Sequence, residues 1–467
     1  MVFSSLVFLF VFLPIILFLY YISKDTYKNY LLLTASLFFY AWGEPTYVII
    51  MLVSIFFNFI FGKKVDINKG SAKKTWLLIS IVFNISMLGV FKYTGFFIEN
   101  LNLIFNLGIK NPGISLPLGI SFFTFQAMSY VIDVYRKDAK VQNSFLNLAL
   151  YISLFPQLVA GPIVRYQTVA DQIDYRIHSL DKFTDGVTRF IVGLSKKVIL
   201  SNSLGMLADT IFNTEVANLT VVSAWIGIVA YSLQIFFDFS GYSDMAIGLG
   251  KMFGFEFLEN FNYPYISKSA GEFWRRWHIS LGSWFRDYVY IPLGGSKKGK
   301  VRTYLNLFIV WFLTGFWHGA SWTFIAWGLY FGILIALEKA FLDKILNRLF
   351  SPIRHLYLIL VVMIGWIFFR ADKFSYAFNY IKCLFGFNKN ILFNNVTISY
   401  INDYGFIILI SILFSIPIIP NINKLLNRYN KYNVYYIVKS FILMSMFVFT
   451  IIKLVNSTYN PFLYFRF

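Results

Sequence analysis

The segment Trp311-Phe-Leu-Thr-Gly-Phe-Trp-His-Gly-Ala-Ser-Trp322 places His318 between two long apolar runs, at about 303–317 and 320–340. A helix that crosses a bilayer needs about 20 mainly apolar residues, so both runs are candidate membrane helices. An ionisable side chain inside such a run is energetically costly and is by default a functional hypothesis. The segment therefore predicts a membrane fold and marks His318 as its chemical centre.

Similar apolar runs recur along the whole chain. The protein has 467 residues, of which 58% are hydrophobic and only 13% are charged, whereas a soluble domain carries about 25% charged residues. We therefore expect an all-α polytopic membrane protein with about 11–13 transmembrane or re-entrant helices. The candidate runs are 2–22, 29–42, 46–62, 75–93, 115–134, 145–161, 187–212, 219–241, 303–317, 320–340, 355–370, 405–420 and 433–456.

The positive charge of the chain fits a membrane protein better than a nucleic-acid-binding protein. The net charge is +19, and its basic residues gather in short segments between apolar runs. The positive-inside rule then places those segments in the cytoplasm and both termini outside. This predicts a membrane domain over 1–456, an extracytoplasmic tail over 457–467, and a bacterial cytoplasmic membrane as the location. One cysteine excludes an intramolecular disulfide framework and any multi-cysteine metal site.

His318 has two readings from the residues alone. Burial would keep its imidazole neutral, as a general base requires, and Gly315, Gly319 and Ala320 would let a substrate approach closely. The alternative is a structural histidine that is hydrogen-bonded to a neighbouring helix.

A second histidine, His278, follows two arginines. At helical spacing Trp274, Arg275 and His278 would share a face. Arginine suits bidentate phosphate contacts, but an amphipathic interfacial helix explains Arg275 and Arg276 equally well. No His-Glu-x-x-His, P-loop or Gly-x-Ser-x-Gly pattern occurs, so a zinc hydrolase, an ATPase and an ordinary serine hydrolase are not supported.

Two carboxylates, Asp238 and Asp244, lie within the apolar segment 236–248. A carboxylate in such surroundings needs partners. Arg275 or Arg276 are the expected partners, which would make the role structural. A proton or cation pathway is the alternative.

The chain ends in Asn460-Pro-Phe-Leu-Tyr-Phe-Arg-Phe467. Pro461 ends the preceding helix, and the aromatic tail beyond it fits an interfacial anchor. The hydroxyl of Tyr464 also has the chemistry of a covalent acyl acceptor.

Seven ordered motifs lie at 116–126, 155–162, 238–244, 261–264, 275–278, 284–288 and 317–319. Together they resemble the membrane-bound O-acyltransferase family, in its bacterial branch that O-acetylates alginate and peptidoglycan. The resemblance implies a fold of many helices around a central pore-like site, with His318 as the essential histidine and His278 as a second catalytic position. It implies an acetyl thioester donor in the cytoplasm, acetyl-CoA, with no bound cofactor or metal, and an acceptor outside. Substrate contacts are expected from Arg275, Arg276, Trp317, Gln126, Asp238 and Ser240.

The terminal Phe462-x-Tyr464-x-x-Phe467 is similar to the terminal motif of a small membrane peptide of teichoic-acid D-alanylation systems, whose tyrosine is thought to carry the acyl group. This similarity implies a relay. His318 would activate Tyr464, Tyr464 would take the acetyl group, and a secreted SGNH-type enzyme would pass it to a polysaccharide hydroxyl. Two other functions stay open: D-alanyl transfer to teichoic acid, and a transporter or flippase that uses Asp238 and Asp244 for coupling. A transporter would be supported by inverted repeats, and we find none.

Overall fold

The computed structural model describes residues 1–463 except 160, 419 and 421–431, and within these ranges it is helical without β-strands. Backbone groups in a bilayer have no water to bond, so a helix satisfies them within its own segment. The predicted all-α polytopic fold is confirmed. Eight helical segments of the described chain are long and apolar enough to cross a membrane: Tyr47–Ile67, Gly70–Phe105, Leu180–Phe212, Val221–Met252, Trp322–Leu346, Ser351–Arg370, Asn395–Phe414 and Ile437–Asn456.

Several other predicted runs form shorter or broken helices. The run 145–161 divides into α7 (Phe145–Ser153) and α8 (Phe155–Leu158), because Leu154 leaves the helical conformation and Pro156 opens the second helix. Proline at the first turn lacks only an N–H that would have no helical partner there. The run 115–134 becomes α6 (Ile120–Arg136), with 17 residues. Apolar length therefore overestimates the number of full spans.

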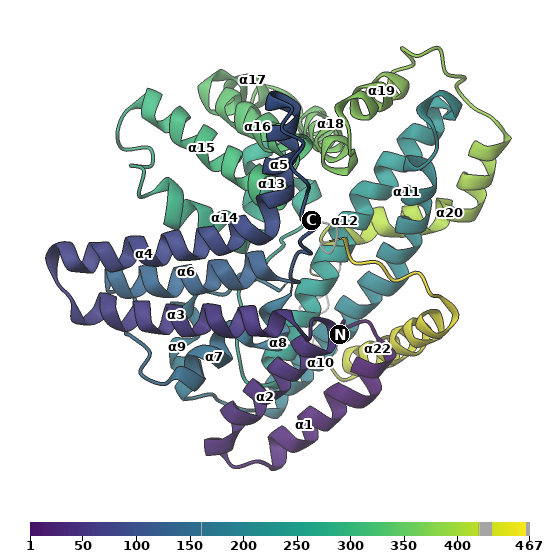
Figure 1. Cartoon of the computed structure of the whole chain (residues 1–467). Coiled ribbons are helices and arrows are strands. Elements are labelled where there is room, and N and C mark those ends of the chain that lie inside the picture. The colour runs from purple at the N-terminus through teal and green to yellow at the C-terminus, as the bar shows by residue number, and fades with distance from the viewer. Residues whose placement is uncertain (160, 419, 421–431, 464–467) are drawn as a thin grey trace. The chain divides into compact units, whose positions relative to one another are not determined.

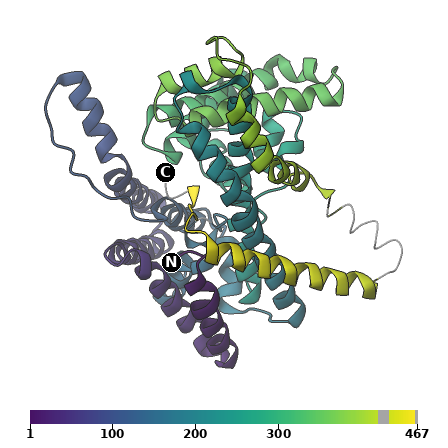
Figure 2. The ribbon, with the colours of Figure 1, turned by 90° about the vertical axis from the view of Figure 1, so that its right-hand side faces the viewer.

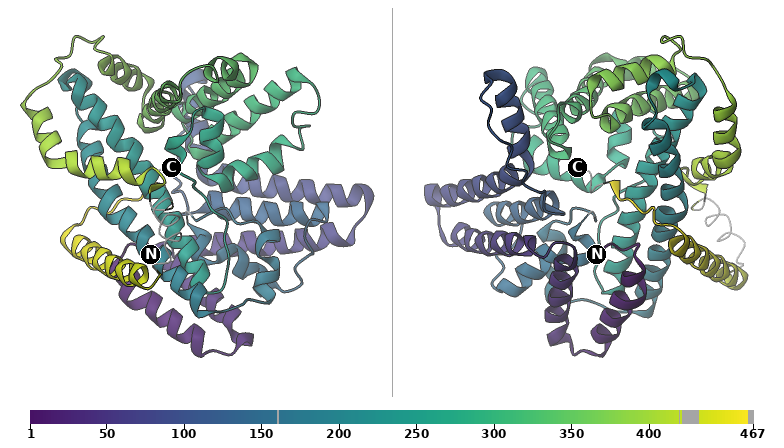
Figure 3. Two further views of the ribbon diagram at one scale, coloured as in Figure 1. Left: turned by 180° about the vertical axis from the view of Figure 1, so that it is seen from behind. Right: turned by 45° about the vertical axis from the view of Figure 1, so that its right-hand side comes forward.

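The chain forms two compact units, and each is described separately. The first unit comprises Met1–Phe190 and Tyr242–Leu258. Within it α3, α4 and α6 lie side by side (Figures 1 and 3). In this group α3 comprises Tyr47–Ile67 and α4 comprises Gly70–Leu88. The unit also contains α1 (Leu13–Ile22), α2 (Asp25–Gly43), α5 (Thr94–Phe105), α9 (Tyr166–Asp174) and most of α10 (Leu180–Ser195).

The second unit comprises Ile191–Gly241 and Glu259–Phe467, and it contains both His278 and His318. A π-helical segment, η3 (Lys196–Ser201), joins α10 to the first complete helix of this unit. The helices are α11 (Asn202–Phe212), the first part of α12 (Val221–Met252), α13 (Ala270–Arg276), α14 (Ile279–Phe285), α15 (Lys300–His318), α16 (Trp322–Leu337), α17 (Asp343–Leu346), α18 (Ser351–Arg370), α19 (Phe374–Leu384), α20 (Asn395–Phe414) and α22 (Tyr432–Asn456).

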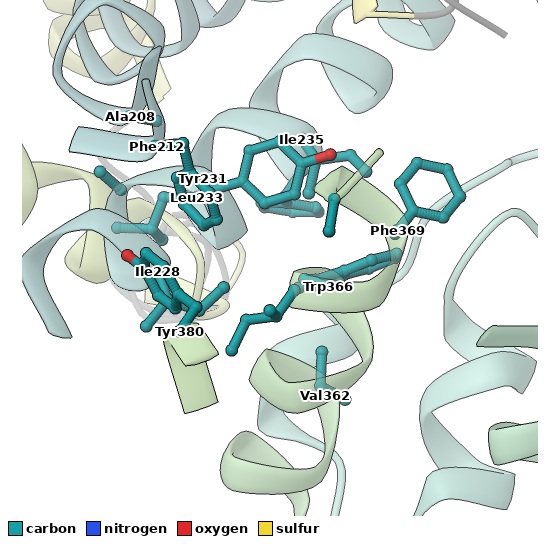
Figure 4. Packing of buried hydrophobic residues seen from close by; sticks show 14 of the residues in the cluster. Ala208, Phe212, Ile228, Tyr231, Leu233, Ile235, Val362, Trp366, Phe369 and Tyr380 are labelled. Atoms are coloured by element: carbon teal, nitrogen blue, oxygen red, sulfur yellow. The ribbon is translucent and has the colours of Figure 1, made fainter. Parts of the chain in front are cut away.

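A core of aromatic and aliphatic side chains holds the second unit together. Figure 4 shows Tyr231 and Ile235 of α12 near Trp366 and Phe369 of α18. Trp366 and Tyr380 are almost completely buried. Lipid tails are as apolar as these side chains, so close van der Waals packing rather than exclusion from water stabilises helix contacts in a membrane.

Glycines let α15 and α16 approach each other closely. A Cβ atom at Gly315 would meet the carbonyl oxygen of Phe324 at 2.4 Å, and one at Gly328 would meet the carbonyl oxygen of Trp311 at 2.4 Å. The expectation that Gly315 admits substrate is therefore wrong, because α16 fills the space beside it. The same holds for Gly319, where a Cβ would meet the Phe324 ring at 2.2 Å.

We expect Gly315→Ala to lower the melting temperature of the purified protein, because overpacking of a close contact costs about 1–3 kcal/mol. Gly405→Ala in α20 is the matched control, since a Cβ there meets only Ile401, at an ordinary contact distance of 3.8 Å. Thermal unfolding followed by size-exclusion chromatography in detergent checks this. Equal melting temperatures for the two variants would contradict the proposed packing.

Candidate active site

His318 is the last residue of α15, at the tight turn that leads into α16. Gly319 caps α15 in an extended conformation, and Ser321 caps α16 by accepting a hydrogen bond from the N–H of Phe324. A serine N-cap satisfies one of the free N–H groups of a helix start. The turn therefore fixes the backbone of His318 at the end of one helix and next to the start of another.

Aromatic rings enclose the His318 imidazole. The ring centroids of Trp317 and Trp327 each lie 4.9 Å away, and that of Phe369 lies 5.3 Å away. The Trp327 and Phe369 rings meet the imidazole edge to face, a favoured aromatic arrangement. His318 is 6% exposed. The predicted burial is thus present, and Trp317 belongs to the wall of this enclosure.

A small cavity of about 10 Å³ lies beside His318, which is the space of about one water molecule. Its ionisable lining side chains are His318 and Asp238. The complete lining is Ile235, Asp238, Phe239, Trp277, His318, Trp327, Trp366, Phe369 and Leu463. A histidine, a carboxylate and the C-terminal segment of the chain therefore meet at one apolar cavity.

The partner of Asp238 is Lys197, not Arg275 or Arg276 as expected. Lys197 Nζ lies 2.6 Å from Asp238 Oδ1, and the two side chains are 3% and 2% exposed. Ser201 donates a hydrogen bond to the same carboxylate at 3.3 Å. Lys197 reaches Asp238 from η3, and π-helical segments are frequent at functional sites.

The C-terminal segment 459–463 lies against these charged residues. The N–H of Leu463 donates to Asp238 Oδ2 at 2.8 Å, and Lys197 donates to the carbonyl oxygen of Pro461. Figures 2 and 3 show the yellow chain that leaves α22 and turns back. Tyr464 follows Leu463 directly in the sequence and lies outside the described residues.

His278 lies behind the cavity and not on its surface. Its ring contacts Phe239 at 4.5 Å and lies 6.2 Å from the Trp317 ring. His278 adopts a left-handed conformation with φ 44°, between the end of α13 and the start of α14. Trp274, Arg275 and His278 therefore do not share one helical face, because the helix ends at Arg276.

The hydrogen bonds of His278 define its tautomer. Asn260 Oδ1 accepts from the N–H of Ser280 at 3.2 Å, which identifies this atom as the oxygen. His278 Nδ1, at 3.2 Å from the same oxygen, must then donate. His278 lies outside the candidate spanning helices, and its burial lowers the pKa of the imidazole to about 3. The neutral ring therefore keeps Nε2 as a proton acceptor and brings no positive charge for a phosphate.

The two arginines lie apart from the cavity lining. Arg276 pairs with Glu272 at 3.0 Å and donates to the carbonyl oxygen of Asn262, while Arg275 is exposed. This matches the interfacial-helix reading for their side chains. Their phosphate-binding role stays a prediction.

The remaining expected site residues lie in different places. Ser240 is buried in α12 within the second unit, two residues after Asp238. Gln126 is completely buried in α6 of the first unit. Asp244 also belongs to the first unit, where its partner is Arg189 at 2.6 Å and again not Arg275 or Arg276.

Sequence reasoning missed Lys197, Asn260 and the walls formed by Trp327, Trp366 and Phe369. Lys197 carried a usable signal, because a lysine that interrupts an apolar run needs a partner at membrane depth. Trp327, Trp366 and Phe369 carried none, since an aromatic residue in an apolar helix is ordinary packing. Among the described residues, no group of three or more His, Cys, Asp or Glu side chains is arranged to hold a metal ion.

Comparison with known proteins assigns the chain to a family. Residues 37–375 match the model of the membrane-bound O-acyltransferase family, MBOAT. The chain is 45% identical over 393 residues to the "Probable alginate O-acetylase" of Pseudomonas aeruginosa, covering 83% of this chain and 75% of that protein. It is 36% identical over 424 residues to the peptidoglycan O-acetyltransferase of Helicobacter pylori, covering 83% and 80%.

A more distant relative is the teichoic acid D-alanyltransferase of Bacillus subtilis. It is 30% identical over 238 residues, which cover 48% of this chain and 59% of that protein. The family match extends over most of the chain and includes His278 and His318. The chain therefore belongs to the membrane-bound O-acyltransferase family and is a multi-pass membrane O-acyltransferase.

Proposed function

We propose that the protein transfers an acetyl group from acetyl-CoA in the cytoplasm, through Tyr464, towards a hydroxyl of a cell-wall or extracellular polysaccharide. The observation that carries this proposal is that Leu463, the residue before Tyr464, lines the same cavity as His318. The acetyl group and the polysaccharide class follow from similarity to alginate and peptidoglycan O-acetylating proteins over 83% of the chain.

The chemistry of the first step uses His318 as a general base. A tyrosine hydroxyl has a pKa near 10, so it needs a base to attack a thioester at neutral pH. His318 accepts the phenolic proton while the Tyr464 oxygen bonds to the carbonyl carbon of the thioester. The carbon–sulfur bond then breaks, and the imidazolium returns the proton to the departing CoA thiolate.

Apolar walls formed by Trp277, Trp327, Trp366 and Phe369 surround the cavity beside His318. Transfer of the acetyl group alone avoids the movement of charged CoA phosphates through an apolar interior. A secreted or membrane-anchored SGNH-type enzyme then takes the acetyl group from Tyr464 and places it on the polysaccharide.

The alternative functions have less support. D-alanyl transfer rests on a relative that matches about half of the chain. A transporter would use Asp238 and Asp244 for coupling, but each carboxylate is held by a cation, Lys197 or Arg189. We place the protein in the bacterial cytoplasmic membrane, where an inner donor and an outer acceptor would both be accessible.

The acceptor and the acyl group are tested in cells that lack the gene. We expect base-labile acetate on the wall or exopolysaccharide to fall to the assay background on deletion, with esterified D-alanine unchanged. Re-expression of the wild-type chain restores acetate. His355→Ala is a matched control, because His355 lies outside the cavity lining and its Nδ1 is hydrogen-bonded to the carbonyl oxygen of Ser267. Loss of D-alanine with normal acetate would favour D-alanylation instead.

A further inference from the structure

The buried ion pair between Lys197 and Asp238 also binds the backbone of the C-terminal segment. We propose that these two residues form a tail clamp that holds residues 459–463 beside His318 and thereby positions the acyl-accepting terminus. The positioning role rests on the proposed relay through Tyr464. The binding of residues 459–463 by Lys197 and Asp238 does not depend on the relay, and it can be measured separately.

The tail clamp engages two backbone groups of opposite polarity. Lys197 donates to the carbonyl oxygen of Pro461, and Asp238 accepts from the N–H of Leu463 at 2.8 Å. The carboxylate uses its other oxygen, Oδ1, for Lys197 at 2.6 Å. Each charge therefore serves the ion pair and the tail at once. Hydrogen bonds to ionised groups are stronger than neutral ones, so the contact fixes both the depth and the direction of the segment.

A non-helical segment at this position needs such partners. The residues between the end of α22 and Leu463 do not continue the helix, and Phe462 and Leu463 are only 6% and 4% exposed. Backbone groups at membrane depth are tolerated outside helices only where protein or water satisfies them. Lys197 bonds the carbonyl oxygen of Pro461, and Asp238 bonds the N–H of Leu463. In a continuous helix these two backbone groups would have been bonded within the helix itself.

Contacts at the start of the segment form an outer anchor, consisting of Asp209, Asn202 and Arg370. Tyr459 donates its hydroxyl proton to Asp209 Oδ2 at 2.7 Å, and Asn202 donates to the side-chain oxygen of Asn460 at 3.1 Å. Arg370 holds the other oxygen of Asp209 at 2.8 Å. The tail is thus bound at two points, and the clamp is the one nearer His318.

A purely structural ion pair would not need the tail. Burial of two charges has a large desolvation cost, and an apolar replacement is often neutral or stabilising. The pair Lys197→Met and Asp238→Leu should therefore leave the helices folded and remove the charges that hold Pro461 and Leu463. This double variant therefore distinguishes an ion pair that holds the tail from one that only joins η3 to α12.

The test measures how fast a cysteine in the tail reacts with a small maleimide. The background is Cys383→Ala, which removes the one native thiol. A cysteine at Leu463 should react slowly in the parent and at least tenfold faster with Lys197→Met and Asp238→Leu. A cysteine at the exposed Ser457 should react at the same rate in both. The matched control pair is Glu272→Gln with Arg276→Gln, which removes another ion pair and should leave position 463 protected.

A second variant avoids any change to the ion pair. Leu463→Pro removes the N–H that Asp238 accepts, whereas Leu463→Ala keeps it. With the reporter cysteine at Phe462, we expect faster modification in the proline variant than in the alanine variant. Equal rates in this pair, or rapid reaction at position 463 in the parent, would overturn the clamp.

The outcome for the relay is read independently with Tyr464→Phe. This change removes the acceptor hydroxyl and should leave the modification rate at position 463 unchanged. Protection that depends on Lys197 and Asp238, together with acetylation that survives Tyr464→Phe, would retain the clamp and reject the relay. The opposite pattern would reject the clamp and retain the relay.

Discussion

His318→Ala is expected to reduce acetyl transfer by about 10²–10⁴-fold, which is the usual contribution of a general base. His318 shares an apolar cavity with Asp238, and the aromatic rings around it leave the imidazole at the surface of that cavity. In the proposed relay His318 takes the proton of the attacking hydroxyl, so loss of the imidazole should lower kcat more than it raises KM. Release of CoA by the purified enzyme measures both.

Correct folding of the variant is the necessary control. Removal of the imidazole leaves a void among Trp317, Trp327 and Phe369, so His318→Gln is tested beside it as a substitution that better fills the space. Both variants should elute as folded protein, with the melting temperature of His318→Gln nearer to that of the parent than that of His318→Ala. Transfer within about threefold of the parent in His318→Gln would contradict a role as base, because glutamine cannot accept the proton.

Tyr464→Phe is expected to abolish transfer from acetyl-CoA, to at most the rate without enzyme. The substitution keeps the aromatic ring of an interfacial anchor and removes only the oxygen that would carry the acetyl group. A matched control is Tyr404→Phe in α20, which removes a half-buried hydroxyl outside the cavity lining. Polysaccharide acetate measured in cells that carry each variant checks the expectation.

The two tyrosine variants discriminate the relay from direct transfer. Tyr464→Phe should behave as an inactive enzyme and Tyr404→Phe as the parent. Normal acetylation by Tyr464→Phe would mean that the acceptor hydroxyl meets the thioester directly, and the tail would then be an anchor. His318→Ala would remain inactive in that case, since a sugar hydroxyl also needs a base.

The membrane fold and the main histidine could be predicted because their signals are local. Apolar runs of near-spanning length give helices with little help from tertiary contacts, and a histidine within such a run is rare enough to be noticed. The breaks were harder to place. The division at Leu154 and the end of α13 at Arg276 depend on a few backbone angles, and the apolar pattern continues across both.

The partners of the carboxylates could not be predicted from spacing. Arg276 was an expected partner of Asp238, but its ion pair is with Glu272, one helical turn away in α13. Lys197 is 41 positions before Asp238, counted as 238 minus 197, and reaches it because the π-helical segment η3 packs near α12. Only the folded chain brings them together. The same applies to the tail, whose contacts with Asp209 and Asn202 span about half of the sequence.

The most direct test incubates the purified protein with radiolabelled acetyl-CoA and locates the label by mass spectrometry of the C-terminal peptide. We expect one acetyl group on Tyr464 in the parent, none in His318→Ala, and less in the variant that combines Lys197→Met with Asp238→Leu. Addition of an SGNH-type partner and its polysaccharide should remove the label from Tyr464. An active enzyme that releases CoA and acetylates polysaccharide while Tyr464 never carries label would contradict the relay through Tyr464.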